Sequence, residues 1–494
     1  MAVKFPTPPG ASAATRPLRF EASIYDCEVE GNLPKELNGT FYRACLDRRY
    51  PSRFPNDALF NEDGAADMFR FNNGSVDYVS RYIHTERFIA ERKARKALFG
   101  LYRNKYTSDP SVQGLSHNTA NTQPVFHAGK LFFLKESNLP MQMHPHTLAT
   151  MGEYDFGGQL KSQTFTAHPK IDTRSGEMIA FGYEAKGDVT DDIVILWIDR
   201  NGKITRDLWF KVPAISMMHD MAITDSHIII PTTGYRTSMD RLKAGKVHWA
   251  HDRAAPTYVA VIPRDAQDAK EVRWFEGPGE QMMHTVNAIS DGNKILLDAP
   301  VSPSNPYPWI ENLDGTPFDP KAGFMTIRRW EFDLGGNSKT WKETNLFPRH
   351  GSSSGLSRMD DRFVGQEFRY SFMGYNDTSK PFDSARGGDM AGRVNNSYGR
   401  YDHDSGKVDS FFVGDTHSLQ ENCFVPRSQS AAEGDGYLIG VATDFAELRS
   451  ELVVVDTQAM AEGAVARVKL PFRIHAQVHG WWVPASQLAL ESIS

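Results

Sequence analysis

The chain has 494 residues, of which 40% are hydrophobic and 23% charged, which is typical of a folded protein with an ample core. The formal net charge of −6 argues against nucleic acid as the main partner. The three scattered cysteines, Cys27, Cys45 and Cys423, form neither a disulfide framework nor a zinc motif. No apolar run approaches the roughly 20 residues of a membrane span, and the first residues lack the apolar core of a signal peptide. We therefore expect a cytoplasmic protein with no membrane span.

The N-terminal part begins with an unpatterned stretch and continues into a hairpin. Residues 1–20 are rich in Pro, Ala and Ser, which predicts a loose arm. Asn73-Gly74 separates two β-rich runs, Met68–Phe71 and Val76–Tyr82. An Asn-Gly pair between two such runs predicts a β-hairpin with a tight turn.

Residues 86–104 break this β pattern. Ala94, Ala97, Leu98 and Leu101 recur at helical spacing, with basic residues on the other faces. A basic amphipathic helix can lie on a membrane, but a surface helix with a solvated charged face is the more common structure. The position of this segment between strands suggests a cap.

From residue 120 onward the hairpin signature repeats along the chain. Asp, Asn and Gly turns separate short apolar runs near residues 128–129, 173–176, 199–202, 291–293, 402–406 and 434–436. Long helical segments are missing, which disfavours an alternation of strands and helices. The pattern predicts a closed all-β array, which usually forms a propeller with a central channel.

Three longer irregular stretches interrupt the array, at residues 232–256, 300–325 and 345–360. Long loops on a rigid β scaffold tend to be lids and substrate walls, so we assign them to the cap together with residues 86–104. No linker divides the chain, and residues 1–494 are predicted to form a single domain.

Four of the sixteen histidines adjoin strand-like apolar runs, namely His168, His219, His284 and His479. Met218-His219-Asp220-Met221-Ala222-Ile223 is nearly repeated at Met283-His284-Thr285-Val286-Asn287-Ala288. The four are too far apart for one local motif, so they fit ligands from different blades. His144, His146, His248, His251 and His403 fall in turns or loops and are expected at the surface.

Imidazole is a common ligand of iron, copper, nickel and zinc. A shell of four neutral imidazoles with open positions could hold Fe(II) and leave room for O2. A ligand histidine usually donates its second N–H to a carboxylate. Glu136 and Glu421 are the candidates. The alternative is that each histidine is an ordinary buried side chain, and each glutamate an ordinary surface one.

The sequence resembles the carotenoid cleavage oxygenase family, and most closely the members that cleave phenolic alkenes, the lignostilbene dioxygenases and isoeugenol monooxygenase. The resemblance extends from residue 37 to residue 480. It is carried by segments that include Leu37–Arg43, Glu91–Asn104, Thr166–Lys170, Met218–Asp220, Asp240–Gly245, Glu421–Arg427, Glu433–Tyr437 and His479-Gly480.

The resemblance implies a seven-bladed β-propeller whose axis carries Fe(II) held by His168, His219, His284 and His479. It also implies that Glu136 and Glu421 orient two of these ligands. A third glutamate of the family is missing from the corresponding stretch, Gly355-Leu356-Ser357-Arg358, so water or a shifted residue such as Glu367 would orient His284 or another ligand instead.

The phenol-cleaving members are marked by a tyrosine and a lysine that contact the 4-hydroxyl group of the substrate. These match Tyr102 and Lys135, which are therefore the predicted catalytic residues. Phe60, Tyr307, Trp309 and Phe318 are further candidates for the substrate-binding wall.

The implied reaction is cleavage of the C=C bond of a 4-hydroxyphenyl alkene by O2, which gives aromatic aldehydes such as vanillin. Lys135 and Tyr102 would stabilise the phenolate, whose proton has a pKa of about 10 in water. No organic cofactor is expected, since no dinucleotide-binding glycine motif is found.

The sequence does not choose between stilbenoids, such as resveratrol or lignostilbene, and phenylpropenes, such as isoeugenol or 4-vinylguaiacol. Two other functions stay open, an oxygenase that cleaves apocarotenoids and a metal-free propeller that serves as a binding scaffold. Family members are often dimers, which leaves a homodimer open.

Overall fold

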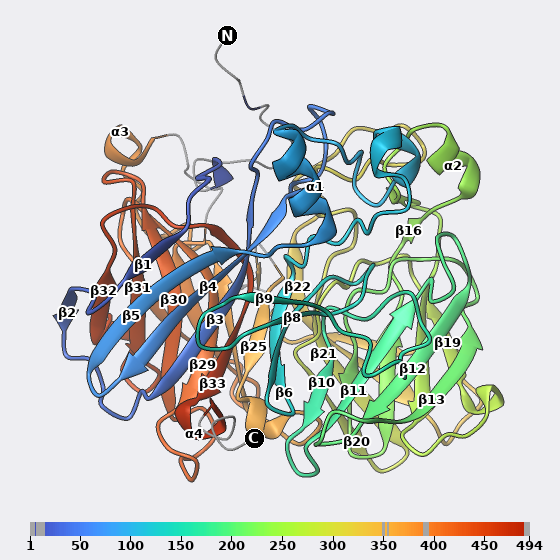
Figure 1. Ribbon diagram of the computed structural model, residues 1–494. Coiled ribbons are helices and arrows are strands. Elements are labelled where there is room, and N and C mark those ends of the chain that lie inside the picture. Colours follow the sequence, from blue (N-terminus) through green and yellow to red (C-terminus); the bar gives the residue numbers. More distant parts are fainter. Residues whose placement is uncertain (1–4, 6–14, 348–350, 353–354, 389–394, 489–494) are drawn as a thin grey trace.

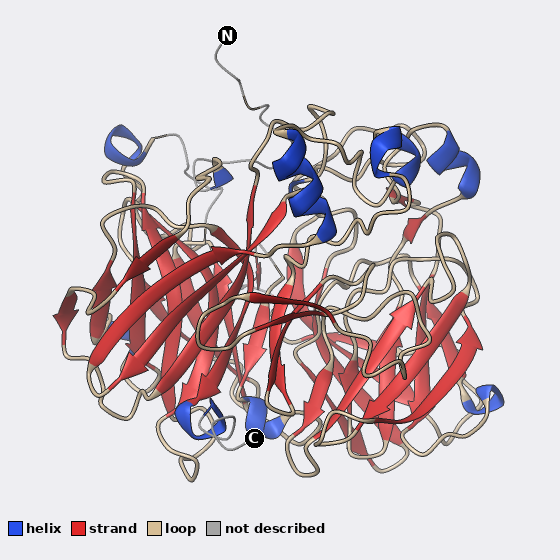
Figure 2. Ribbon diagram, in the orientation of Figure 1, coloured by secondary structure: helices blue, strands red, loops and turns tan. Residues whose placement is uncertain are grey.

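The computed structural model describes residue 5 and residues 15–347, 351–352, 355–388 and 395–488. It is a seven-bladed β-propeller with 41% strand and 9% helix. Figure 1 shows the blades side by side around the axis, and Figure 2 shows how few and short the helices are. The prediction of an all-β propeller is confirmed.

Five blades are antiparallel sheets that the chain completes one after another. From the innermost strand outward, the first blade contains β6 (Gln123–His127), β7 (Lys130–Leu134), β8 (Met141–Met143) and β9 (Thr150–Glu153), and the second contains β10 (Lys170–Asp172), β11 (Glu177–Tyr183), β12 (Asp192–Ile198) and β13 (Ile204–Lys211). The third contains β14 (Ala222–Ile223), β15 (His227–Pro231), β18 (Thr257–Pro263) and β19 (Arg273–Gly277), and the fourth contains β20 (Asn287–Asp291), β21 (Lys294–Val301), β22 (Met325–Asp333) and β23 (Lys342–Asn345), with β24 (Gly351–Ser352) on β22. The fifth contains β25 (Ser357–Met359), β26 (Tyr370–Tyr375), β27 (Ser397–Asp402) and β28 (Val408–Phe412).

The other two blades join the two ends of the chain and close the ring. In one, the late strand β33 (Ala476–Pro484) is innermost and pairs with β3 (Gly39–Asp47), followed by β4 (Asp63–Asn72), β5 (Ser75–Tyr82) and β1 (Ala22–Ile24). In the other, β29 (His417–Pro426), β30 (Gly436–Asp444), β31 (Arg449–Asp456) and β32 (Ala466–Lys469) are completed by the early strand β2 (Val29–Gly31). The ring thus has no unpaired seam between its first and last blades.

The core consists of one apolar cluster between each pair of neighbouring blades. Strand β12 shows how the sequence fits this arrangement. Ile193, Ile195 and Trp197 pack toward the β14 blade, and the alternate residues Val194, Leu196 and Ile198 pack toward the β6 blade. A strand buried on both faces therefore reads as a continuous apolar run.

The turn chemistry follows the prediction from sequence. Asn73 and Gly74 both have positive φ, 53° and 85°, and Asn72 pairs with Ser75 across the turn between β4 and β5. Ala128 and Gly129, with φ of 50° and 73°, join β6 to β7 in the same way. Positive φ at both central positions is the geometry that matches the twist of a hairpin.

The helix in the segment 86–104 is shorter than its apolar spacing suggested. Helix α1 (Glu86–Ala94) ends where Arg95 adopts a left-handed conformation, with φ of 55°. The Glu91 carboxylate then accepts hydrogen bonds from the backbone N–H groups of Leu98 and Phe99. Leu98 and Leu101 are buried, as expected, but in irregular chain rather than on a helix.

Helices α1 and α2 (Met239–Lys243) lie with the short strand β16 (Tyr235–Arg236) at one end of the propeller, and α4 (Ala485–Leu488) lies at the other (Figure 1). Strand β16 pairs with β17 (Ala250–His251) in the predicted loop 232–256. A fourth short helix, α3, covers Ser384–Gly387. Most of the predicted arm 1–20, and residues 348–350 and 353–354 of the loop 345–360, lie outside the described residues.

Three histidines expected at the surface have buried side chains instead. His248 and His251 are 0% and 1% exposed, because Glu184 and Asn312 hydrogen-bond to their rings inside the structure. The ring of His403 lies against Asp298 and Ser371. The prediction was wrong because a position in a turn or loop does not reveal whether other parts of the chain cover that turn.

Among the described helices, none is long and apolar enough to cross a membrane. Cytoplasmic location and a homodimer stay predictions.

Candidate metal centre

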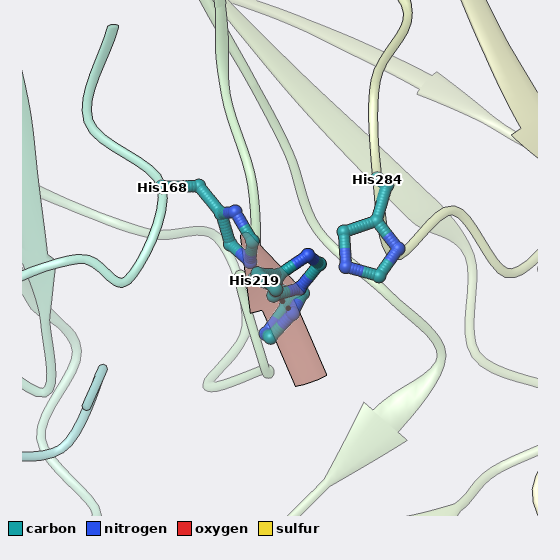
Figure 3. Close-up of side chains that lie close together, drawn as sticks. His168, His219 and His284 are labelled. Carbon is teal, nitrogen blue, oxygen red and sulfur yellow. Dashed lines mark hydrogen bonds between the residues drawn. The ribbon is translucent and has the colours of Figure 1, made fainter. Parts of the chain in front are cut away.

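Four histidines from four different blades meet at the propeller axis. His168, His219 and His284 lie just before the innermost strands β10, β14 and β20, and His479 lies within β33. Their ligand atoms all lie within 4.8 Å of one another. Figure 3 shows the rings of His168, His219 and His284 turned toward one another from separate segments. The structure thus brings together the four histidines that the sequence singled out.

Backbone irregularities adjoin this cluster in the last two blades. The register between β3 and β33 shifts so that Ala44 faces His479 while Cys45 faces Gln477. The register between β29 and β30 shifts between Leu419 and Asn422, which places Glu421 in the irregular part. Bulges re-aim side chains and are common beside functional sites, and neither one has a recognisable sequence signal.

Two of the histidines donate to buried carboxylates. His219 Nδ1 lies 2.5 Å from Glu136 Oε2, and His479 Nδ1 lies 2.8 Å from Glu421 Oε1. A carboxylate on Nδ1 fixes the tautomer and leaves the lone pair of Nε2 for a ligand. The predicted orienting glutamates therefore lie beside the predicted rings.

The glutamates remain ionised despite their burial. Burial opposes ionisation, but His219, Arg103 and Lys135 bring the pKa of Glu136 down to about 2. For Glu421, burial is likewise outweighed by Arg358 and His479, and its pKa also falls to about 2. A fixed negative charge behind the ring makes each histidine a better donor to a cation.

The donor set fits a metal ion. Burial holds the pKa of His168 and His284 well below the usual range, so these rings are neutral, which is the form that binds metals. In the described part of the chain, both ring nitrogens of His284 and Nε2 of His479 are buried with no hydrogen-bond partner. The Nε2 atoms of His168 and His219 face each other at 3.0 Å. Buried ring nitrogens that have no hydrogen-bond partner and converge on one point are suited to bind one cation together.

His284 differs from His219 and His479 in its surroundings. A side chain at Gly355 would begin 4.0 Å from His284 Nδ1 and 2.8 Å from Met325 Sδ, so Met325 fills the space beside this glycine. Glu367, the suggested substitute for the missing glutamate, is exposed and cannot orient the buried ring.

A second set of contacts ties the ligand-bearing segments to one another. Asp220 accepts hydrogen bonds from the backbone N–H and the hydroxyl of Thr285, at 2.7 and 2.9 Å, and pairs with Lys170 at 2.8 Å. Asp220 and Thr285 directly follow the predicted ligands His219 and His284, and Lys170 lies two positions after the predicted ligand His168. This clamp of Lys170, Asp220 and Thr285 therefore sets the spacing of three blades at the candidate metal site. No sequence pattern indicated it, because the three residues are far apart in the chain.

The innermost strands enclose the predicted central channel. A cavity of about 920 Å3 is lined by residues of all seven innermost strands and includes His168, His284 and His479. Neither Tyr102 nor Lys135 lines it. The predicted phenol-binding residues therefore lie outside this channel.

Tyr102 and Lys135 lie next to each other away from that channel. Lys135 Nζ is 5.1 Å from the centre of the Tyr102 ring, and the lysine is only 5% exposed. Burial lowers the pKa of Lys135 to about 7 and raises that of Tyr102 far above neutrality. Tyr102 therefore keeps its O–H proton and is a donor at neutral pH, while Lys135 is present as both amine and ammonium near pH 7.

The candidate wall residues divide into two groups. Trp309 contacts Phe60 and Tyr307, with ring centres 5.4 and 4.9 Å apart, and Tyr102, Tyr307 and Trp309 pack on the same core cluster. Phe318 is half-buried, and within the described residues no ring contact joins it to these aromatics. The structure brings Phe60, Tyr307 and Trp309 into contact, and Lys135 lies between the Phe60 carbonyl and the Tyr102 ring. It gives no such support for Phe318.

Fold and site together define a seven-bladed propeller with an axial four-histidine site that can hold a metal ion. The chain belongs to the carotenoid oxygenase family, whose family model, described as retinal pigment epithelial membrane protein (RPE65), matches residues 15–484.

The chain is similar to known proteins over nearly its full length. It is 42% identical to isoeugenol monooxygenase of Pseudomonas putida, over 94% of this chain and 96% of that one. It is 40% identical to lignostilbene-α,β-dioxygenase isozyme III of Sphingomonas paucimobilis, over 98% and 99%. The crystal structure of Pseudomonas brassicacearum lignostilbene dioxygenase superposes with a TM-score of 0.93 at 37% identity, covering 98% of this chain and 100% of that one.

Proposed function

We propose that the protein is an Fe(II)-dependent dioxygenase that cleaves the C=C bond of 4-hydroxyphenyl alkenes with O2. The names of the similar proteins support this substrate class, since isoeugenol and lignostilbene are both phenolic alkenes. The four converging imidazoles, whose ligand atoms lie within 4.8 Å of one another, support the metal. Held by these rings, Fe(II) would supply the site at which O2 is activated, without an organic cofactor.

The observation that carries the proposal is the buried amino group of Lys135 beside Tyr102. Within the described residues no carboxylate forms an ion pair with Lys135, since its neighbour Glu136 is engaged by His219 and Tyr183. A buried cation without a bonded counter-charge attracts an anion strongly. The 4-oxygen of a phenol is such an anion once its proton has moved to Lys135.

The residues then act in a defined order. The amine of Lys135 takes the phenol proton, and the resulting ammonium, together with the Tyr102 hydroxyl, donates hydrogen bonds to the phenolate. The negative charge is delocalised onto the distal alkene carbon, which becomes the electron-rich position. The C=C bond breaks, each carbon receives one oxygen atom from O2, and the alkene supplies all the electrons. A guaiacyl alkene gives vanillin.

The substitution Lys135→Met tests this role. We expect the rate of O2 consumption with a 4-hydroxystilbene to fall by about 10²-fold or more, which is typical for the loss of a proton-transfer group. Lys161→Met, which changes an exposed lysine that does not line the channel, is the control and keeps the parent rate. Iron content is measured in both variants, so that metal loss is separated from loss of the phenolate contact. Parent-like cleavage by Lys135→Met would refute the phenolate role.

A further inference from the structure

The ammonium of Lys135 is held by two neutral oxygens. Nζ donates to the backbone carbonyl of Phe60 at 3.1 Å and to Asn121 Oδ1 at 3.0 Å. An ammonium has three N–H groups, and the described residues provide no third acceptor for this one. One N–H therefore stays free in a direction that the other two bonds determine.

The orientation of Asn121 is itself fixed. Its side chain is fully buried, and Nδ2 donates to the backbone carbonyls of Phe60 and Glu62 at 3.0 and 2.8 Å. Two carbonyl acceptors on one side require the NH2 group there, because a flipped amide would place oxygen against oxygen. Oδ1 consequently faces Lys135.

The neutrality of these acceptors matters for the chemistry. A carboxylate in the place of Asn121 would satisfy the same N–H but would also cancel the positive charge that a phenolate needs. A neutral amide directs the ammonium and leaves its charge uncompensated. The same contacts tie the ammonium to Phe60, a candidate wall residue.

We propose that Asn121 is a positioning residue that directs the third position on Lys135 Nζ, a lone pair in the amine and an N–H in the ammonium, to the 4-oxygen of the substrate and so makes the site selective for phenols. The proposal rests on the proposed function and extends it to a residue that does not itself touch the substrate. Burial lowers the pKa of Lys135 to about 7, which makes an amine available near neutral pH to accept the phenol proton. The proton moves from the phenol oxygen to Nζ, and an ammonium–phenolate pair results.

The pH profile of kcat/KM on a 4-hydroxystilbene tests the proposal. In the parent protein kcat/KM should rise as pH increases through about 7, because a protonated Lys135 cannot accept the phenol proton. Asn121→Asp adds a negative charge beside the ammonium and should move this rise to higher pH by about one unit or more. Asn121→Ala removes one of the two fixed acceptors and should lower kcat/KM about tenfold or more.

Asn118→Ala is the matched control. Asn118 is also buried in the same loop and holds the backbone at Leu139 and Ala120, but it does not contact Lys135. It should lower stability without moving the pH profile. If Asn121→Asp leaves the profile at the parent position, or if Asn118→Ala shifts it equally, Asn121 has only a structural role and the proposal is overturned.

A probe that is not turned over separates this proposal from the proposed function. The ultraviolet absorbance of bound 4-hydroxybenzaldehyde reports whether its phenol is ionised in the site. We expect the parent protein to bind it as the phenolate, and Asn121→Asp to bind it more weakly and less ionised. If this difference in ionisation is found but the parent protein cleaves no phenolic alkene, the proposed cleavage reaction is refuted while the role of Asn121 is supported. No binding by the parent, or equal ionisation in both proteins, would contradict the role of Asn121.

Discussion

Arg103 and Glu136 form a buried ion pair, with Nη1 of the arginine 3.7 Å from Oε1 of the glutamate. Arg103 directly follows Tyr102, and Glu136 directly follows Lys135. The same ion pair therefore brings together the two predicted phenol-binding residues and connects them to His219 through the Glu136 carboxylate. Arg103 is fixed in turn by Glu184 at 2.5 Å, and Glu184 also binds His248. The predicted metal centre and the predicted phenol-binding residues thus share one buried network of ion pairs and hydrogen bonds.

Replacement of His219 should abolish metal binding at the axis. His219→Ala removes one of four imidazoles and leaves Glu136 without its ring partner, so we expect purified protein with little bound iron. Elemental analysis after loading with Fe(II) measures this directly. His251→Gln, which changes a buried histidine outside the cluster, should retain the full metal content. Equal iron in both variants would show that the four histidines do not form the site.

Glu136→Gln should weaken metal binding without abolishing it. The loss of a carboxylate behind a ligand histidine typically costs 10- to 100-fold in metal affinity, and competition with a fluorescent chelator measures that ratio. Glu451→Gln is the control, because this buried glutamate pairs with Arg467 and Lys469 in another blade. Unchanged affinity in Glu136→Gln would argue that the bond to His219 has no influence on the metal.

Asp220→Asn should destabilise the propeller. The change removes the charge that faces Lys170 and weakens the hydrogen bonds from Thr285, so we expect a loss of about 1–3 kcal/mol in the free energy of unfolding. Urea denaturation measures this, together with the metal affinity. Asp225→Asn, an exposed change in the same segment, should cost less than about 0.5 kcal/mol. Similar stability of the two variants would mean that the clamp does not hold the blades.

The pH dependence of stability should contain a contribution from His475. Burial opposes its charge, but Asp67 and Asp47 raise its pKa to about 9. A folded-state pKa above the unfolded value of about 6.5 stabilises the protein fully below pH 6.5, and this stabilisation is lost as pH rises through 9. We expect the parent to lose on the order of 3 kcal/mol across that window. His475→Gln should be less stable at pH 6 and show a flatter profile, measured by denaturation at fixed metal content. An equally steep decline in the variant would assign the effect to other groups.

The sequence predicted best what short-range chemistry determines. Asn73-Gly74 specifies a turn by itself, and the apolar run of β12 specifies a strand buried on both faces. His219 and His284 were identified as candidate ligands because each precedes a strand in a similar sequence segment. The resemblance to a known family added the blade number and the candidate pair Tyr102 and Lys135.

What the sequence did not predict depends on contacts between distant residues. Helix α1 ends at Ala94 because Glu91 binds the backbone beyond it, and helical spacing further along could not reveal this. His248 and His475 gave no signal, because their partners Glu184, Asp47 and Asp67 are far away in the chain. The bulges at His479 and Glu421 depend on pairing with strands from other parts of the sequence, as does the contact between Asn121 and Lys135.

O2 consumption by the Fe(II)-loaded protein with a 4-hydroxystilbene and with its 4-methoxy ether tests most directly whether cleavage depends on the phenol. Both alkenes have the same carbon skeleton, but only the first can give its phenolic proton to Lys135. We expect the phenol to consume one O2 per alkene and to yield aromatic aldehydes, and the ether to react at least about 10²-fold more slowly. Equal rates with the two alkenes, or no O2 consumption with the phenol, would contradict this expectation.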